Sequence, residues 1–116
     1  MGTLVIEDIE RFGKKFEKSF RDENVKRHYE ICTELNDLYD RKNHDYGNSF
    51  GETYKKLGII SAVTRITDKY NRLVSLCTKE QRVADETIED TLRDMANYAI
   101  MTLIEMEKEK RSTKSV

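Results

Sequence analysis

The chain is short and rich in charged residues, but its net charge is close to zero. Its 116 residues are 37% apolar and 37% charged, which is enough for one small domain. The 21 basic and 22 acidic residues give a formal charge of −1, so direct nucleic-acid binding is not expected. Because no apolar run approaches the roughly 20 residues of a membrane span and the first residues lack the pattern of a signal peptide, we expect a soluble cytoplasmic protein.

The first 23 residues have the pattern of a short amphipathic helix. Apolar side chains recur at helical spacing, although a glycine in the middle costs roughly 1 kcal/mol relative to alanine. We expect this N-terminal arm to pack on the rest of the domain or on another chain. The apolar positions are Val5, Ile9, Phe12 and Phe16.

Three long helices are predicted between residues 24 and 107. The chain has no proline and only 5 glycines, so it offers few breaks. The helices are expected over about 24–42, over 59–77, and from an N-cap at Asp85 to Met106. The polar residues 108–116 are expected to be a frayed tail. The predicted fold is therefore all-α, a helical bundle of three long helices and a shorter N-terminal one.

The third helix carries an apolar arc that is too wide for one neighbour. On a helical wheel the arc runs from Tyr98 to Ile100 over about 200°, with Met101 beyond it, whereas a surface helix shows a stripe of about 100°. Helices of a small monomer bury one side each. The surplus predicts that the bundle is completed by oligomerisation, as a homo-oligomer.

The two cysteines, Cys32 and Cys77, lie within apolar periodic segments. They show no CxxC spacing and no partnering histidine. We therefore expect two buried thiols and neither a disulfide nor a zinc site.

An acidic ladder occupies the polar side of the third helix. Glu86, Asp90 and Asp94 follow one another at steps of four, and like charges at this spacing repel by a few tenths of a kcal/mol. One interpretation is a Mg²⁺ site that binds substrate phosphates, with the three carboxylates as metal ligands and catalytic residues. The other is a solvated acidic face paired with Arg93 and nearby bases.

A second group of charges lies on the middle helix, opposite its apolar stripe. The cations could neutralise nucleotide phosphates next to the acidic ladder. Alternatively, alternating signs on a helix face form an ordinary exposed ion-pair surface. The residues are Arg65, Asp68, Lys69 and Arg72.

The stretch from residue 41 to 51 is the least helix-like part of the chain, and we expect a loop there. Tyr46 and Phe50 could stack a nucleobase, and Asp45 or Asn48 could bind its edge or a sugar hydroxyl. In the alternative, the aromatic side chains close the end of the bundle and the polar ones cap the turn.

Three blocks of sequence resemble the nucleotide modification associated domain 1 family of phages and bacteria. They are KNHDYG from Lys42, RITDKYNRL from Arg65 and DETIEDTLRDMANYA from Asp85, and the resemblance covers about residues 28–106. That family is in turn similar to the all-α nucleoside triphosphate pyrophosphatases, the MazG and dimeric dUTPase group, which are Mg²⁺-dependent helical oligomers.

The resemblance implies a phage or prophage protein that handles nucleotides. It implies that the chain binds a (deoxy)nucleoside triphosphate with Mg²⁺ as cofactor and could hydrolyse it to monophosphate and pyrophosphate. The pyrophosphatases pair an ExxE motif with a later ExxD, and here that order is reversed. The alternative is a non-enzymatic interaction module that binds a host or phage protein. The implied substrate-binding residues are Lys42, Asp45, Tyr46, Asp68, Lys69 and Arg72, beside the acidic ladder.

Overall fold

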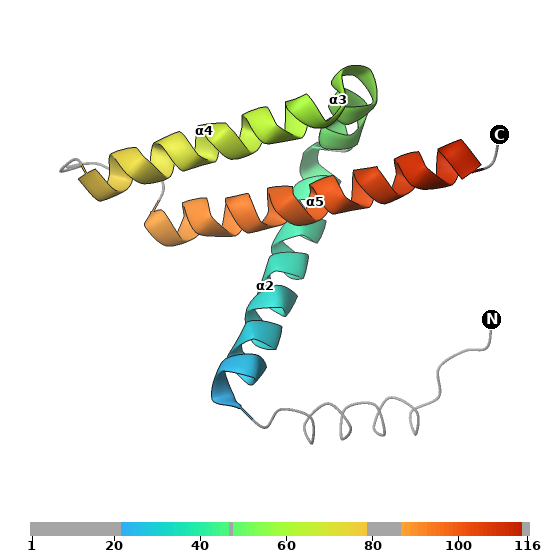
Figure 1. The fold of residues 1–116 in the computed structure, drawn as a ribbon. Helices are drawn as coiled ribbons and strands as arrows, with labels where there is room; N and C mark the ends of the chain where they lie inside the picture. Colours follow the sequence, from blue (N-terminus) through green and yellow to red (C-terminus); the bar gives the residue numbers. More distant parts are fainter. Residues whose placement is uncertain (1–21, 47, 79–86, 115–116) are drawn as a thin grey trace, which may run out of the picture. The chain divides into compact units, whose positions relative to one another are not determined.

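The computed structural model describes residues 22–46, 48–78 and 87–114. Within these ranges the chain is helical, with four helices in the order α2, α3, α4, α5 and no strand (Figure 1). The predicted all-α class is confirmed. The predicted N-terminal helix and the N-cap at Asp85 lie outside the described residues. None of the helices in these ranges combines the length and the apolar character that crossing a bilayer requires.

The first compact unit of the chain ends at Asn36, within helix α2 (Glu23–Tyr46). Asp22 caps the N-terminus of this helix: its Oδ1 accepts a hydrogen bond of 2.6 Å from the Asn24 amide. Arg27 pairs with Glu34 at 3.3 Å along the exposed helix surface. Leu35 is the buried apolar residue of the described part of this unit.

The second unit, from Asp37 on, contains the last turns of α2 and the helices α3 (Ser49–Leu57), α4 (Ile59–Thr78) and α5 (Ile88–Lys114). Helix α3 ends at Gly58, which adopts a φ of 74° and donates its amide to the Tyr54 carbonyl at 2.7 Å. That left-handed conformation favours glycine, so the chain turns sharply there from α3 into α4.

The prediction of a loop over residues 41–51 is wrong, because most of this stretch is helical. Helix α2 continues to Tyr46 and α3 begins at Ser49. Gly51, within the stretch predicted as a loop, lies inside α3. It leaves space for a carboxylate: a Cβ at Gly51 would lie 3.1 Å from Glu105 Oε2. This glycine therefore permits close packing and does not break the helix.

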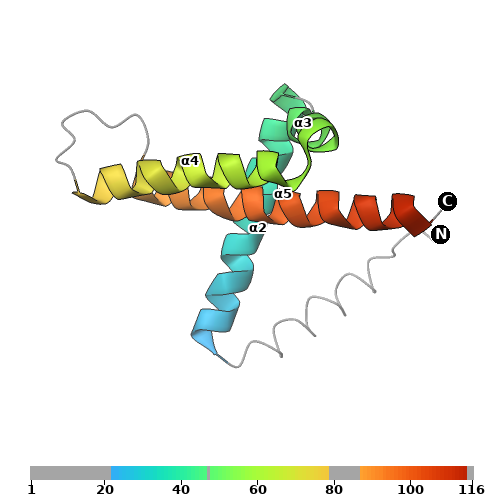
Figure 2. The same ribbon diagram turned by 45° about the horizontal axis from the view of Figure 1, so that its top comes forward.

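Helices α4 and α5 run side by side and antiparallel in both views (Figures 1 and 2). Helix α4 begins at the predicted residue 59 and ends one residue after the predicted residue 77. At the start of α5, the Asp90 amide donates to Thr87 Oγ1 at 3.1 Å, and Asp90 Oδ2 accepts from the Thr87 amide at 3.4 Å. These reciprocal bonds form a capping box.

Residues 108–114 are helical, where the sequence predicted a frayed tail. Helix α5 includes residues 108–114. Ion pairs one turn apart support it, because Lys108 lies 3.2 Å from Glu105 and Arg111 lies 3.8 Å from Glu107.

The core of the second unit is small. Phe50, Tyr54 and Ala62 are its buried apolar residues, and Tyr98 and Met101 pack against them. Met101 therefore packs against this core. Burial raises the pKa of the Tyr54 phenol, and nearby glutamates on α5 raise it further.

Both cysteines are free thiols, and the expectation that they are buried is wrong. Cys32 on α2 and Cys77 on α4 are exposed. The Cys32 Sγ lies 3.8 Å from His28 Nδ1. The apolar helix stripes that carry these cysteines are not covered by the described residues of the chain, so the thiols remain at the surface.

Candidate functional site

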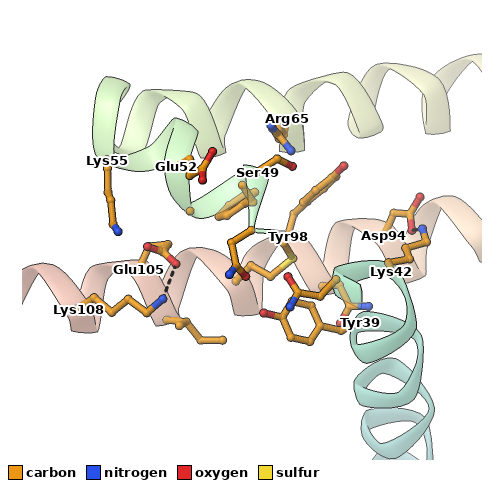
Figure 3. A pocket seen from close by; sticks show the side chains of 17 residues that line it. Tyr39, Lys42, Ser49, Glu52, Lys55, Arg65, Asp94, Tyr98, Glu105 and Lys108 are labelled. Carbon is orange, nitrogen blue, oxygen red and sulfur yellow. Dashed lines mark hydrogen bonds and ion pairs between the residues drawn. The ribbon is translucent and has the colours of Figure 1, made fainter. Parts of the chain in front are cut away.

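A cavity of about 500 Å³ lies in the second unit, within the usual range of roughly 300 to 1,000 Å³ for ligand pockets. The last turns of α2, the start of α3 and one side of α5 form its walls, and α4 contributes Arg65. Figure 3 shows Lys42 and Asp94 together at one end, and Lys55, Glu105 and Lys108 at the other. The cavity is lined by charged, amide and aromatic side chains together, a mixture suited to a polar ligand with a ring.

An ion cluster joins three helices at the first end of the cavity. The Asp94 carboxylate of α5 lies 2.8 Å from Lys42 Nζ of α2 and 3.0 Å from Lys69 Nζ of α4. The Asp94 side chain is only 17% exposed. Each member comes from a different block of the sequence resemblance. The fold thus brings together three residues that lie up to 52 positions apart along the chain.

The two ammonium groups change the acidity of Asp94. Burial acts to raise the pKa of this carboxyl, but hydrogen bonds and charge interactions with Lys42 and Lys69 outweigh it and hold the pKa below its ordinary value. Asp94 is therefore ionised at neutral pH. Two ammonium groups thus contact one carboxylate within the described residues.

Aromatic rings line the middle of the cavity. Phe50 of α3 stacks on Tyr98 of α5, with ring centroids 5.9 Å apart and an interplanar angle of 16°. The Arg65 guanidinium lies 5.4 Å from the centroid of the Phe50 ring. Tyr39 of α2 also lines the cavity. Phe50 lines the cavity and also belongs to the core, so its position fits both interpretations of this ring, stacking on a base and closing the bundle.

A buried glutamate closes the second end. Glu105 is 7% exposed and pairs with Lys108 at 3.2 Å, while Lys55 of α3 lines the same end. Sequence reasoning missed Glu105, Lys108 and Asn97, which is 9% exposed. A signal existed, because steps of four and three connect Asp94 to the other members of this side of α5: Tyr98, Met101, Glu105 and Lys108.

The remaining predicted binding residues lie elsewhere or outside the described structure. Asp68 and Arg72 are exposed on α4 and do not line the cavity. Asp45 and Tyr46 are the last residues of α2, and their side chains are outside the described part. Glu86 also lies outside it.

The two described acids of the ladder have separate structural partners. Asp90 takes part in the capping box of α5 and pairs with Arg93 at 3.5 Å, whereas Asp94 binds the two lysines. Among the described residues, no cluster of three His, Cys, Asp or Glu side chains could hold a metal ion. Asp90 and Asp94 are thus each held by neighbouring protein groups. The Mg²⁺ site that would include Glu86 stays a prediction.

Comparison with known proteins gives one match. The family model described as nucleotide modification associated domain 1 matches residues 42–106, which is more than half of the chain. The chain therefore belongs to the nucleotide modification associated domain 1 family. Neither a curated protein nor a solved structure matches it.

Proposed function

We propose that this member of the family binds a nucleotide in the cavity between α2, α3 and α5. The observation that carries the proposal is the meeting of Lys42, Lys69 and Asp94, one from each sequence block, at the edge of an aromatic-lined cavity. A nucleotide needs cations for its phosphates and a flat apolar surface for its base, and this cavity offers both side by side.

We place the phosphates at the Lys42 end. Lys42 and Lys69 both contact the Asp94 carboxylate there, and Arg65 adds another cation to the cavity wall. At the opposite end, Lys55 and Lys108 are balanced by Glu52 and Glu105. An ammonium group has three N–H donors and Asp94 uses one of those on Lys42, whose side chain is 51% exposed. Lys42 can therefore bind a phosphate oxygen without leaving Asp94.

The base then lies toward the aromatic middle of the cavity. Tyr39 and Tyr98 provide ring faces, and stacking on such a ring is worth about 1–3 kcal/mol per base. Asn43, Asn48 and Asn97 supply amides that can donate to and accept from a base edge. This arrangement favours a nucleotide over an inorganic polyphosphate, which has no ring to stack.

The described carboxylates do not fit a Mg²⁺ site by themselves. Asp94 faces two ammonium groups, and Asp90 is held at the N-terminus of α5. We therefore attribute the neutralisation of phosphate charge to the lysines and assign no hydrolytic step. Calorimetric titration of Mg²⁺ into the chain and into its Glu86→Gln variant tests the predicted metal site independently of nucleotide binding.

The proposal is tested with a nucleoside, its monophosphate and its triphosphate, using calorimetry on the whole chain and on Lys42→Gln. We expect the wild-type affinity to rise with each phosphate. Lys42→Gln should weaken triphosphate binding about 10- to 100-fold, because a hydrogen bond to a charged group is worth about 1.5–3 kcal/mol, and should leave the nucleoside almost unchanged.

Lys56→Gln is the matched control, because Lys56 is exposed on α3 and does not line the cavity. It removes the same charge and should change binding by less than about twofold. If no nucleotide binds to the wild-type chain, or if both lysine variants lose affinity equally, the proposed nucleotide site is wrong.

A further inference from the structure

Glu105 places a buried carboxylate in the wall of the cavity. The residue is 7% exposed, and its Oε2 accepts a hydrogen bond of 3.2 Å from Lys108 Nζ. Its Oε1 has no hydrogen-bond partner among the described residues. In this part of the chain no side-chain nitrogen or oxygen is both enclosed and unpaired, so Oε1 is open to the cavity that Glu105 lines. This oxygen is therefore available to a ligand.

Helix α3 leaves room for this carboxylate at Gly51. A Cβ at Gly51 would lie 3.1 Å from Glu105 Oε2 and 3.5 Å from Oε1, so a side chain there would crowd both oxygens. The carboxylate thus lies against the backbone of α3 and between two helices. A group that is already held in place loses little conformational freedom when a ligand binds to it.

The ion pair with Lys108 does not explain why an acid is buried at this position. The Lys108 side chain is 59% exposed, and an ion pair with an exposed lysine adds little to stability. Burying a carboxylate is costly unless its oxygens are satisfied. An ionised carboxylate only accepts hydrogen bonds, so the ligand that satisfies Oε1 has to donate one.

Glu105 lies at the end of the cavity opposite the proposed phosphate site. Asp94 and Glu105 are eleven residues apart on α5, which is about 16 Å along the helix, and Tyr98 lies between them. In a nucleotide, the Watson–Crick edge of the base points away from the sugar and the phosphates. With the phosphates at Lys42 and the base beside Tyr98, this edge faces Glu105.

Guanine has the Watson–Crick edge that best matches this end of the cavity. It presents two adjacent donors, N1–H and the 2-amino group, next to the O6 acceptor. The two donors match the two oxygens of Glu105, because a carboxylate has about four acceptor sites and Oε2 can keep Lys108 as well. Figure 3 shows Lys55 pointing toward Glu105 from α3, so that an ammonium group lies at the same end as a donor for O6.

The other bases match this carboxylate less well. Adenine and cytosine have a ring nitrogen that accepts next to their amino group, and its lone pair would face the second oxygen of Glu105. Thymine and uracil have one N–H between two carbonyl groups. Each of these bases offers Glu105 one hydrogen bond and at least one repulsive contact, whereas guanine offers two hydrogen bonds.

We propose that the cavity prefers guanine nucleotides and that Glu105 determines this specificity, by accepting hydrogen bonds from N1–H and the 2-amino group. The inference rests on the proposed nucleotide site, because the phosphates at Lys42 set the direction in which the base points.

Calorimetric titration of the whole chain with GTP, ITP and ATP tests the preference. ITP is GTP without the 2-amino group, so it loses one hydrogen bond to Glu105 and keeps every other group. ITP should bind about 10- to 100-fold more weakly than GTP, because the lost hydrogen bond is to a charged group. ATP should bind at least as weakly as ITP. Equal affinities for GTP and ITP would overturn the proposal.

Glu105→Gln tests the residue. Glutamine keeps the size of the side chain but replaces one acceptor oxygen with an amide that donates. The variant should bind GTP about 10- to 100-fold more weakly and should not weaken ATP, so the preference for GTP should disappear. Glu107→Gln is the matched control, because the Glu107 side chain is 67% exposed on the same helix and does not line the cavity. It should change GTP affinity by less than about twofold, and equal weakening by both variants would overturn the proposal.

The same titrations separate this inference from the proposed nucleotide site. If GTP, ITP and ATP bind alike and Lys42→Gln weakens all three, the nucleotide site stands and the guanine preference is wrong. If none of the three binds, the nucleotide site itself is wrong and this inference fails with it. The comparison of GTP with ITP uses the wild-type chain, so it decides the matter even if Glu105→Gln fails to fold.

Discussion

The two sides of the α4–α5 pair reverse the usual distribution of polar and apolar residues. On the cavity side, Asn97 and Glu105 are 9% and 7% exposed. On the opposite side, Ile60 and Leu103 are 63% and 60% exposed. Polar side chains are normally outside and apolar ones inside, so a buried polar group and a large exposed apolar patch are the informative exceptions. This helix pair shows both.

The two sides differ in how their side chains are satisfied within the chain. Burying a charge costs free energy unless it is paired, and the cavity side supplies the pairs: Asp94 with two lysines and Glu105 with Lys108. These groups are ordered within one chain, as a binding site requires. The apolar side has no such pairs: its large side chains remain exposed within the described residues.

The largest expected effect on stability is that of removing a buried aromatic ring, compared with removing an exposed one. Phe50→Ala should lower the free energy of unfolding by about 3–5 kcal/mol at any protein concentration, because Phe50 is 7% exposed and stacks on Tyr98. Tyr70 on the apolar side is 56% exposed, so Tyr70→Ala should cost less than about 1 kcal/mol at high dilution. Denaturant unfolding followed by circular dichroism measures both.

The concentration dependence sharpens this comparison. If a second chain contacts this ring, the cost of Tyr70→Ala should grow as the protein is concentrated, because the described residues leave the ring 56% exposed. The cost of Phe50→Ala should stay constant. A cost of Tyr70→Ala that equals that of Phe50→Ala at high dilution would show that Tyr70 is already buried within one chain.

A smaller effect is expected at the ion cluster. Asp94→Asn should lower the free energy of unfolding by about 1.5–3 kcal/mol, because it removes two charged hydrogen bonds and leaves two ammonium groups together. Asp68 is exposed on the same polar side of α4, and Asp68→Asn should change stability by less than about 0.5 kcal/mol. Equal effects would mean that the cluster is an ordinary surface ion pair.

The pH dependence follows from the lowered pKa of Asp94. A carboxyl whose pKa is lower in the folded chain stabilises that chain above its ordinary pKa of 3.8. This contribution is lost as the pH falls from that value through the lower pKa of the folded state. Asp94→Asn should therefore be less sensitive to acid than the wild type in urea titrations between neutral pH and pH 3. Parallel loss of stability in both proteins would contradict this assignment.

The smallest predicted effect concerns the start of α5. Thr87→Ala removes the hydroxyl that accepts a hydrogen bond from the Asp90 amide. It should lower the free energy of unfolding by about 1 kcal/mol. The melting temperature measures it, and Thr87→Ser should restore most of the loss because serine retains the hydroxyl. Nucleotide affinity should not change, since Thr87 does not line the cavity.

Local periodicity explains which elements could be predicted from the sequence. The second predicted helix matches α4 because its apolar residues repeat at a regular helical spacing. Helix α3 was missed, since Gly51 looked like a turn residue and only the packing of Glu105 shows why glycine stands there. The prediction of a frayed tail was wrong for residues 108–114, because ion pairs within α5 support the helix there.

The all-α class, the three long helices and the apolar surplus of α5 could be predicted from the sequence, because all three depend on spacing along one helix. The meeting of Lys42, Lys69 and Asp94 could not be predicted in this way, since residues on three helices become neighbours through packing. Packing also decides which side of α5 faces the cavity. A helical wheel shows the polar and apolar sides of α5 but not its neighbours, and here the neighbouring helices cover the polar side.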